Sequence, residues 1–288
     1  MRCQTALALT PDRGPPLTTK ASTLALVLMA GAASADCAAD KGPCRVPGGT
    51  YHIVLPDGVT GPIPAILLLH GYGGEGLGTL RNKPMVSLML GRGYAVIAPD
   101  GQPRDDGEGR TWDFHPDRPA TRDETAFLTA VADDATARFG LQRDRMLLAG
   151  FSIGGSMTSY VACAKPGAFA AYAPVAGSFW RPHPKSCAGP VRLFHTHGKA
   201  DRTVPLEGRE IMPGFVQGNV FEAMGIWRAA NGCPSPDPQG TRSLGIYKIQ
   251  DWTRCAPDAS LSFALHDGGH SIPKGWAQMA VDWFEALP

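Results

Sequence analysis

Short and nearly continuous hydrophobic runs recur along the chain and predict the strands of a β-sheet. Most of these runs do not alternate with polar residues, which is typical of parallel strands that are covered on both faces. The predicted strands cover residues 51–55, 65–70, 94–100, 145–150, 169–177, 191–198 and 261–269.

Helical periodicity is clearest in residues 121–140, between two of these runs. Thr121 and Glu124 form a capping-box pattern at its start, and Gly140 is expected to end the helix. One face of this segment is hydrophobic, because apolar residues recur every four positions at Phe127, Val131, Ala135 and Phe139. Two further helices are predicted at residues 220–232 and 275–287. Alternating strands and helices predict the α/β class, with a doubly wound, mostly parallel sheet and helices on both faces.

The N-terminal segment, residues 1–35, has the pattern of an export signal. The apolar run "TLALVLMAGAASA" follows Lys20, and Ala33-Ser34-Ala35 fits a cleavage site before Asp36. The run is too short to span a bilayer as a mature helix, and the alternative is a buried helix. We therefore expect a secreted or periplasmic protein, with residues 36–288 forming a single catalytic domain and making no membrane contact after the signal is removed.

The cysteine content is consistent with an exported protein. Of the seven cysteines, Cys3 belongs to the signal, which leaves an even set of six. In an exported protein such a set suggests disulfides. Sequence order suggests the pairs Cys37–Cys44, Cys163–Cys187 and Cys233–Cys255, and the alternative is free buried thiols. No C-x-x-C pair is present, so a zinc or thioredoxin-like site is a poor interpretation.

Composition and charge exclude several other classes. Hydrophobic residues make up 43% of the chain and charged residues 18%, which supports a large core. The formal net charge is +1 and there is no long run of one sign, so neither nucleic acid nor an anionic membrane surface is an expected partner. We expect a monomer.

The stretch "GFSIG", residues 150–154, lies between a predicted strand and a predicted helix and matches G-x-S-x-G. In a nucleophile elbow of this kind the serine occupies a strained turn, and glycines two positions away avoid collisions with the backbone. Ser152 is therefore the candidate nucleophile, and the N–H of Ile153 is a candidate oxyanion donor at a helix N-terminus. The alternative is a glycine-rich turn with an incidental serine.

A nucleophilic serine needs a base and a group that orients the base. Asp201 in "HGKADRTVP" and His270 in "HDGGHSIP" follow predicted strands in the order Ser…Asp…His. Both fall at carboxyl ends of strands, where open α/β sheets gather their ligands. The rivals Asp267 and Glu207 are weaker acid candidates. His195 is interpreted as a core histidine and His197 as a residue that shapes the following turn.

The second oxyanion donor is expected in "LLLHGYGG", residues 67–74, which follows an early strand. The N–H of Tyr72, directly after His70-Gly71, is the candidate donor, and the alternative is an ordinary glycine turn. No metal and no organic cofactor is needed for the acyl transfer that these groups would perform.

Together, "LLLHGYGG", "GFSIGGSM", "HGKADRTVP" and "DGGHSIP" resemble secreted α/β-hydrolase esterases of the polyhydroxybutyrate-depolymerase-like group, which includes feruloyl and acetylxylan esterases. The resemblance spans roughly residues 46 to 287. It implies the α/β-hydrolase fold, a triad of Ser152, Asp201 and His270, and oxyanion donors at Tyr72 and Ile153. It departs at Ile272, where the group commonly has tryptophan, and at Tyr72, where cysteine or threonine is frequent.

The substrate is expected to be a small-molecule or oligomeric ester, either a polyhydroxybutyrate-type oligomer or a feruloyl or acetyl ester of the plant cell wall. Trp112 and Trp180 lie in loops after predicted strands and are candidate substrate contacts, although they could equally plug or support those loops. Two alternatives remain, an acyltransferase on the same scaffold and a secreted carbohydrate- or lipid-binding protein without catalysis.

Overall fold

The centre of the molecule is a β-sheet, seen in a computed structural model that describes residue 37 and residues 42–288 except 116 and 119. The predicted signal, residues 1–35, lies outside the described residues. Within the described residues the sheet has ten strands, in the order β1-β2-β4-β3-β7-β8-β9-β14-β13-β12. These strands are β1 (Cys44–Val46), β2 (Gly49–Val54), β3 (Ile63–Leu69), β4 (Ala95–Pro99), β7 (Leu141–Phe151), β8 (Ala171–Val175), β9 (Arg192–Gly198), β12 (Gly240–Leu244), β13 (Tyr247–Trp252) and β14 (Ser260–His266).

The middle six strands, from β4 to β14 in that order, are parallel to their neighbours. Every residue of β4 and β8 is buried, as the continuous hydrophobic runs predicted. The outer strands pair antiparallel at both ends of the sheet. The mostly parallel, doubly wound sheet is therefore confirmed.

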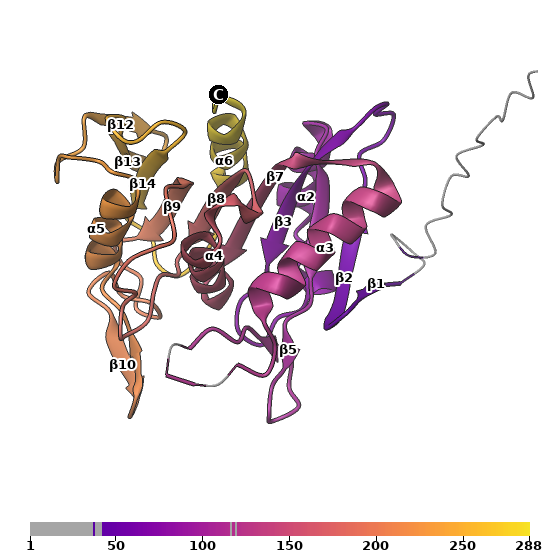
Figure 1. Ribbon diagram of the computed structural model, residues 1–288, viewed down its shortest axis with the longest axis horizontal. Helices are drawn as coiled ribbons and strands as arrows, with labels where there is room; N and C mark the ends of the chain where they lie inside the picture. Colours follow the sequence, from indigo (N-terminus) through magenta and orange to yellow (C-terminus); the bar gives the residue numbers. More distant parts are fainter. Residues whose placement is uncertain (1–36, 38–41, 116, 119) are drawn as a thin grey trace, which may run out of the picture. The chain divides into compact units, whose positions relative to one another are not determined.

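Helices cover both faces of this sheet (Figure 1). They are α1 (Gly76–Leu80), α2 (Lys83–Gly91), α3 (Glu124–Phe139), α4 (Ile153–Ala164), α5 (Val220–Ala230) and α6 (Trp276–Glu285), with a 3-10 turn at Pro166–Ala168. One hydrophobic cluster joins the sheet to α3, α4 and α5, and it includes Phe127, Met157 and Trp227. A second cluster joins the opposite face to α2 and α6 through residues such as Met89 and Trp283.

The start of the helix predicted at residues 121–140, which is α3, needs a correction. Asp123, not Thr121, is the N-cap of α3, and its carboxylate accepts a hydrogen bond from the N–H of Ala126 at 2.9 Å. Thr121 instead donates its backbone N–H and its hydroxyl to Asp113 in the preceding loop. Gly140 ends the helix in the left-handed conformation, as predicted.

Two short hairpins interrupt the alternation of strands and helices. One joins β5 (Gln102–Pro103) to β6 (Arg110–Thr111), and the other joins β10 (Arg209–Met212) to β11 (Phe215–Gln217). The first follows β4 and the second follows β9, so both leave the sheet at the carboxyl ends of its parallel strands. Figure 1 shows β5 and β10 at the same end of the molecule.

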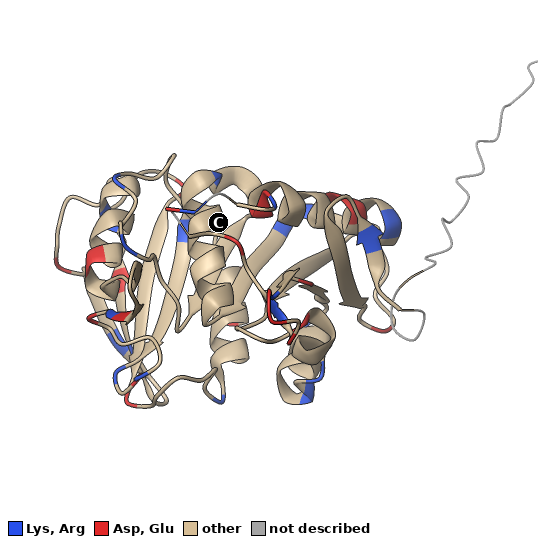
Figure 2. Cartoon of the chain, turned by 90° about the horizontal axis from the view of Figure 1, so that it is seen from below, with Lys and Arg blue, Asp and Glu red and all other residues tan. Residues whose placement is uncertain are grey.

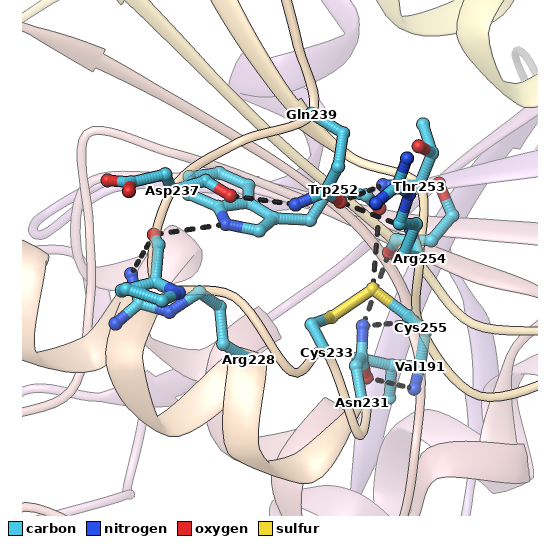
Figure 3. The surroundings of a disulfide bond; sticks show 12 residues. Val191, Arg228, Asn231, Cys233, Asp237, Gln239, Trp252, Thr253, Arg254 and Cys255 are labelled. Carbon is cyan, nitrogen blue, oxygen red and sulfur yellow. Dashed lines mark hydrogen bonds between the residues drawn. A yellow bond between two sulfur atoms is a disulfide. The ribbon is translucent and has the colours of Figure 1, made fainter.

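The three predicted cysteine pairs, Cys37–Cys44, Cys163–Cys187 and Cys233–Cys255, are confirmed as disulfides. Figure 3 shows the pair Cys233–Cys255, which joins the segment after α5 to the segment after β13. Beside it, the buried side chain of Asn231 accepts from the N–H of Val191 at 2.8 Å and donates to its carbonyl at 2.9 Å. The start of β9 is therefore fastened directly beside this disulfide.

Charged residues of both signs are distributed over the helices and loops in Figure 2, whereas most strand positions carry neither sign. This distribution agrees with the small net charge of the whole sequence. Among the described residues, none of the helices combines the length and the hydropathy needed to cross a bilayer.

Candidate active site

Ser152 occupies the turn between β7 and α4 in a conformation that L-residues rarely adopt. Its φ is 58° and its ψ is −122°, and its N–H donates to the carbonyl of Val175 at 2.9 Å. Glycines make this turn possible: a Cβ at Gly154 would lie 2.5 Å from the carbonyl oxygens of Leu69 and His70. The sequence pattern therefore produced the strained strand-to-helix turn that it predicted.

The side chains of Ser152, His270 and Asp201 meet at the carboxyl edge of the sheet. The Nε2 of His270 lies 2.9 Å from the Oγ of Ser152, and its Nδ1 lies 2.7 Å from the Oδ2 of Asp201. Since an ionised carboxylate only accepts, Nδ1 carries the proton and Nε2 accepts from the serine hydroxyl. The imidazole is therefore oriented to take a proton from Ser152.

Asp201 is buried, and its carboxylate is well supplied with donors. Its Oδ1 accepts from the backbone N–H groups of Thr203 and Val204, both at 2.8 Å. Burial alone would raise the pKa of Asp201, but the hydrogen bonds from His270 and from Val204 outweigh burial and hold the pKa below its ordinary value. The carboxylate stays ionised and faces His270.

The loop that carries the acid and the loop that carries the base are joined by backbone hydrogen bonds. Lys199 donates its N–H to His266 at 2.8 Å, and Ala200 donates its N–H to Gly268 at 3.1 Å. The backbones pass so closely that a Cβ at Gly198 would lie 2.3 Å from the carbonyl oxygen of Gly268. Asp201 and His270 are therefore held together by the main chain as well as by their side chains.

Two backbone N–H groups lie close to Ser152 without a protein acceptor among the described residues, those of Tyr72 and Ile153. Ile153 is the first residue of α4, where N–H groups have no partner within the helix. The loop before Tyr72 reaches the serine, because a Cβ at Gly71 would lie 3.5 Å from the Cβ of Ser152. Both N–H groups are therefore candidate oxyanion donors.

His70 braces the loop that carries Tyr72. Its Nε2 accepts from the N–H of Gly101 at 2.9 Å, so Nδ1 bears the proton and donates to the carbonyl of Gly71 at 2.8 Å. Burial lowers the pKa of His70, although the hydrogen bond to Gly71 and the charge of Asp100 oppose this change. His70 is therefore a neutral, fixed residue of the loop.

Trp112 supports the loop that carries Tyr72 and does not lie on an open surface. It is only 3% exposed, and its Nε1–H donates to the carbonyl of His70 at 2.9 Å. Of the two roles considered for Trp112, support of a loop agrees with its burial and direct contact with substrate does not. The sequence could not distinguish them, because an aromatic residue in a loop carries no sign of which way it faces.

Trp180 lies in an aromatic cluster with Phe114, His115 and Phe215, which comes from the β10–β11 hairpin. It is partly exposed, and it forms an isolated bridge with Gln217. The cluster joins the loop after β6 to the hairpin. Trp180 therefore remains a candidate for substrate contact. The side chain of Tyr72 is 63% exposed, although the sequence pointed to this residue only for its backbone N–H.

The rival residues do not enter the site. Asp267 is an exposed residue paired with Lys199, and Glu207 is exposed. His195 is 1% exposed and bonds to His197, so its interpretation as a core histidine is confirmed. Within the described residues there is no group of three or more His, Cys, Asp or Glu placed to hold a metal ion.

Comparison with known proteins finds esterases among the proteins that are similar to this chain. The model of the prolyl oligopeptidase family matches residues 82–180, about a third of the chain, which include Ser152 but neither Asp201 nor His270. NocK of Nocardia uniformis subsp. tsuyamanensis, an esterase by name, is 27% identical over 242 residues, covering 77% of this chain and 67% of NocK. Feruloyl esterase C of Emericella nidulans is 26% identical over 241 residues, covering 80% of this chain and 79% of that protein.

Solved structures share the fold. The acetyl xylan esterase from Aspergillus awamori superposes with a TM-score of 0.62 at 17% identity, covering 83% of this chain and 94% of that one. A carboxylesterase from Mesorhizobium loti gives 0.56 at 19% identity, covering 85% and 99%. The chain therefore has the α/β-hydrolase fold, and the proteins to which its sequence is similar include esterases.

Proposed function

We propose that the chain is a serine carboxylic ester hydrolase that acts through a covalent acyl-enzyme on Ser152. The observation that carries this proposal is the continuous chain of hydrogen bonds from the Ser152 hydroxyl through His270 to Asp201, at 2.9 and 2.7 Å. An esterase of the feruloyl or acetylxylan type is the activity that the similar proteins support.

In the proposed reaction His270 takes the hydroxyl proton while Ser152 attacks the ester carbonyl. Asp201 holds the imidazole and stabilises the imidazolium that forms, and the N–H groups of Ile153 and Tyr72 bind the oxyanion. His270 then protonates the leaving alcohol. Water repeats the sequence on the acyl-enzyme and releases the acid, so the enzyme returns to its starting state.

The substrates we propose are feruloyl or acetyl esters of carbohydrates. The relatives that support this class are named as a feruloyl esterase and as a bifunctional acetylxylan esterase/xylanase of Neocallimastix patriciarum, which is 28% identical over 155 residues, 54% of this chain and 22% of that protein. Polyhydroxybutyrate-type oligomers are the second class to test. Three disulfides support a location outside the reducing cytoplasm, secreted or periplasmic.

The decisive experiment compares the wild type with Ser152→Ala on p-nitrophenyl acetate, methyl ferulate, acetylated xylo-oligosaccharides and hydroxybutyrate oligomers. Loss of the nucleophile should lower kcat/KM by several orders of magnitude on each ester that the wild type cleaves, with an unchanged circular dichroism spectrum. A variant that retains most of its activity would overturn the proposed triad.

The same assay separates the alternatives. Added alcohols that divert the acyl group into new esters, at the expense of free acid, would favour an acyltransferase. A folded wild type that turns over none of these esters, yet binds a carbohydrate or a lipid, would favour a protein without catalysis.

A further inference from the structure

Two buried histidines lie behind Asp201, and the proposed reaction does not use them. His195 and His197 are on the same face of β9, are 1% and 0% exposed, and have their ring nitrogens 3.1 Å apart. The Nε2 of His197 lies 2.8 Å from the carbonyl oxygen of Val204 and 3.7 Å from the Oδ2 of Asp201.

The hydrogen-bond partners fix the tautomers of both rings. A carbonyl oxygen can only accept, so the Nε2 of His197 carries a proton and donates it to Val204. The Nδ1 of His197 is then an acceptor, and the Nε2 of His195 must donate to it. Burial lowers the pKa of His197, although Val204 and Asp201 oppose this effect, and burial lowers the pKa of His195 still further. Both rings are neutral.

Val204 connects this histidine pair to the acid. Its N–H donates to the Oδ1 of Asp201 at 2.8 Å, while its carbonyl accepts from His197. The turn of residues 201–204, here called the Asp201 turn, is thereby fastened back onto β9, the strand from which it has just emerged. A displacement of Val204 would move one of the two backbone donors that hold the carboxylate.

We propose that His197 is a positioning residue for Asp201 and that His195 fixes the tautomer in which His197 can act. This inference rests on the proposed function, because it explains how the acid of the proposed triad is held in position toward His270. The imidazole of His197 holds the Asp201 turn without adding a positive charge beside the carboxylate, so the charge of Asp201 remains available to His270.

The test compares His197→Gln with His197→Asn. The amide nitrogen of glutamine can take the place of Nε2 and donate to Val204, whereas that of asparagine lies nearer the place of Nδ1 and does not reach it. We expect asparagine to lower kcat between about tenfold and a hundredfold with little change in KM, since small misplacements of catalytic groups cost this much. Glutamine should restore most of the loss.

Thr196→Val is the matched control on the same strand. Thr196 lies between the two histidines in the sequence and is fully buried. Its hydroxyl has no hydrogen-bond partner within the described part of the chain. Its replacement removes a buried polar group without breaking a hydrogen bond, so kcat should stay within about twofold of wild type.

A second readout does not depend on turnover. The proton between the Nδ1 of His270 and Asp201 should give a downfield NMR resonance in wild type, Thr196→Val and His197→Gln, and this resonance should shift or broaden in His197→Asn. An unchanged resonance and an unchanged kcat in folded His197→Asn would overturn the proposal, and so would a glutamine variant as impaired as asparagine. A wild type that cleaves no ester would refute the proposed function alone, because the resonance would still report on His197.

Discussion

His70 donates its Nδ1–H to the carbonyl oxygen of Gly71 at 2.8 Å, and this bond, together with one from the N–H of Gly74 at 3.0 Å, holds the peptide that joins Gly71 to Tyr72. In a trans peptide the carbonyl and the N–H point in opposite directions. With the Gly71 carbonyl held by His70, the N–H of Tyr72 is turned away from that ring. His70 therefore helps to orient the expected oxyanion donor through the backbone of Gly71.

Replacing His70 by leucine should weaken the oxyanion hole. Removal of one donor typically lowers kcat about 10²- to 10³-fold, and a loosened peptide should lose part of that, so we expect a fall of about tenfold to a hundredfold with a smaller change in KM. Steady-state kinetics on p-nitrophenyl acetate measure this. His70→Asn, whose amide can donate to Gly71, should retain more activity than leucine, and equal activity of the two would contradict this role.

Gly154 should not tolerate even a methyl group. A Cβ there would lie 2.5 Å from two backbone carbonyl oxygens, those of Leu69 and His70, which cannot move without shifting β3. We expect Gly154→Ala to lower the free energy of unfolding by roughly 1–3 kcal/mol and to reduce activity, because the Ser152 turn must shift.

Gly91 offers the matched control, since a Cβ there would meet nothing within 4 Å at the end of α2. Gly91→Ala should be neutral or stabilising by up to about 1 kcal/mol. Urea unfolding measures both variants. A Gly154→Ala protein as stable and as active as Gly91→Ala would show that the turn is less crowded than its geometry indicates.

Asp100 should contribute stability that is lost in acid. Burial alone would raise its pKa, but hydrogen bonds with His52, Thr50 and the N–H of Gly76 lower the pKa to about 2. The ordinary value is 3.8, so this contribution is fully present above about pH 4 and disappears as the pH falls through about 2. Its size above pH 4 is about 2 kcal/mol.

Urea unfolding of wild type and Asp100→Asn across this range tests the prediction. The difference in the free energy of unfolding between the two proteins should shrink as the pH falls from about 4 toward 2. A difference that stays constant with pH would mean that the carboxylate is not preferentially ionised in the folded protein.

The disulfide Cys233–Cys255 should stabilise the fold without taking part in the reaction. It closes a separation of 22 residues, and its removal in the double serine variant should cost roughly 3 kcal/mol in the chain-entropy model. The pair Cys37–Cys44 spans only 7 residues, so its removal should cost less. Thermal denaturation gives the order, and kcat at a temperature where both variants are folded should equal that of wild type. A reversed order would show that native-state contacts, not chain entropy, dominate.

The central strands could be predicted because each carries a continuous hydrophobic run that both helical layers bury. β12 could not be predicted in this way, since four of its five residues are exposed and it carries no hydrophobic run. Ser152, Asp201 and His270 could be placed at one edge because they follow parallel strands in order. Asp123 was missed as the N-cap of α3, because Thr121 offered an equally acceptable capping pattern two residues earlier.

The hairpins β5–β6 and β10–β11 have a consequence for the evolution of this scaffold. Neither pairs with the ten-stranded sheet, yet both leave it at the edge where Ser152 and His270 meet. Insertions or exchanges in either hairpin would change the surroundings of this edge while every strand of the ten-stranded sheet keeps its register. The β5–β6 hairpin also supports the loop that carries Tyr72, because the carbonyl of Arg110 accepts from the N–H of Gly73 at 2.9 Å. A library confined to residues 211–215 would therefore vary this edge of the molecule at less risk to the fold than one that includes residues 103–110.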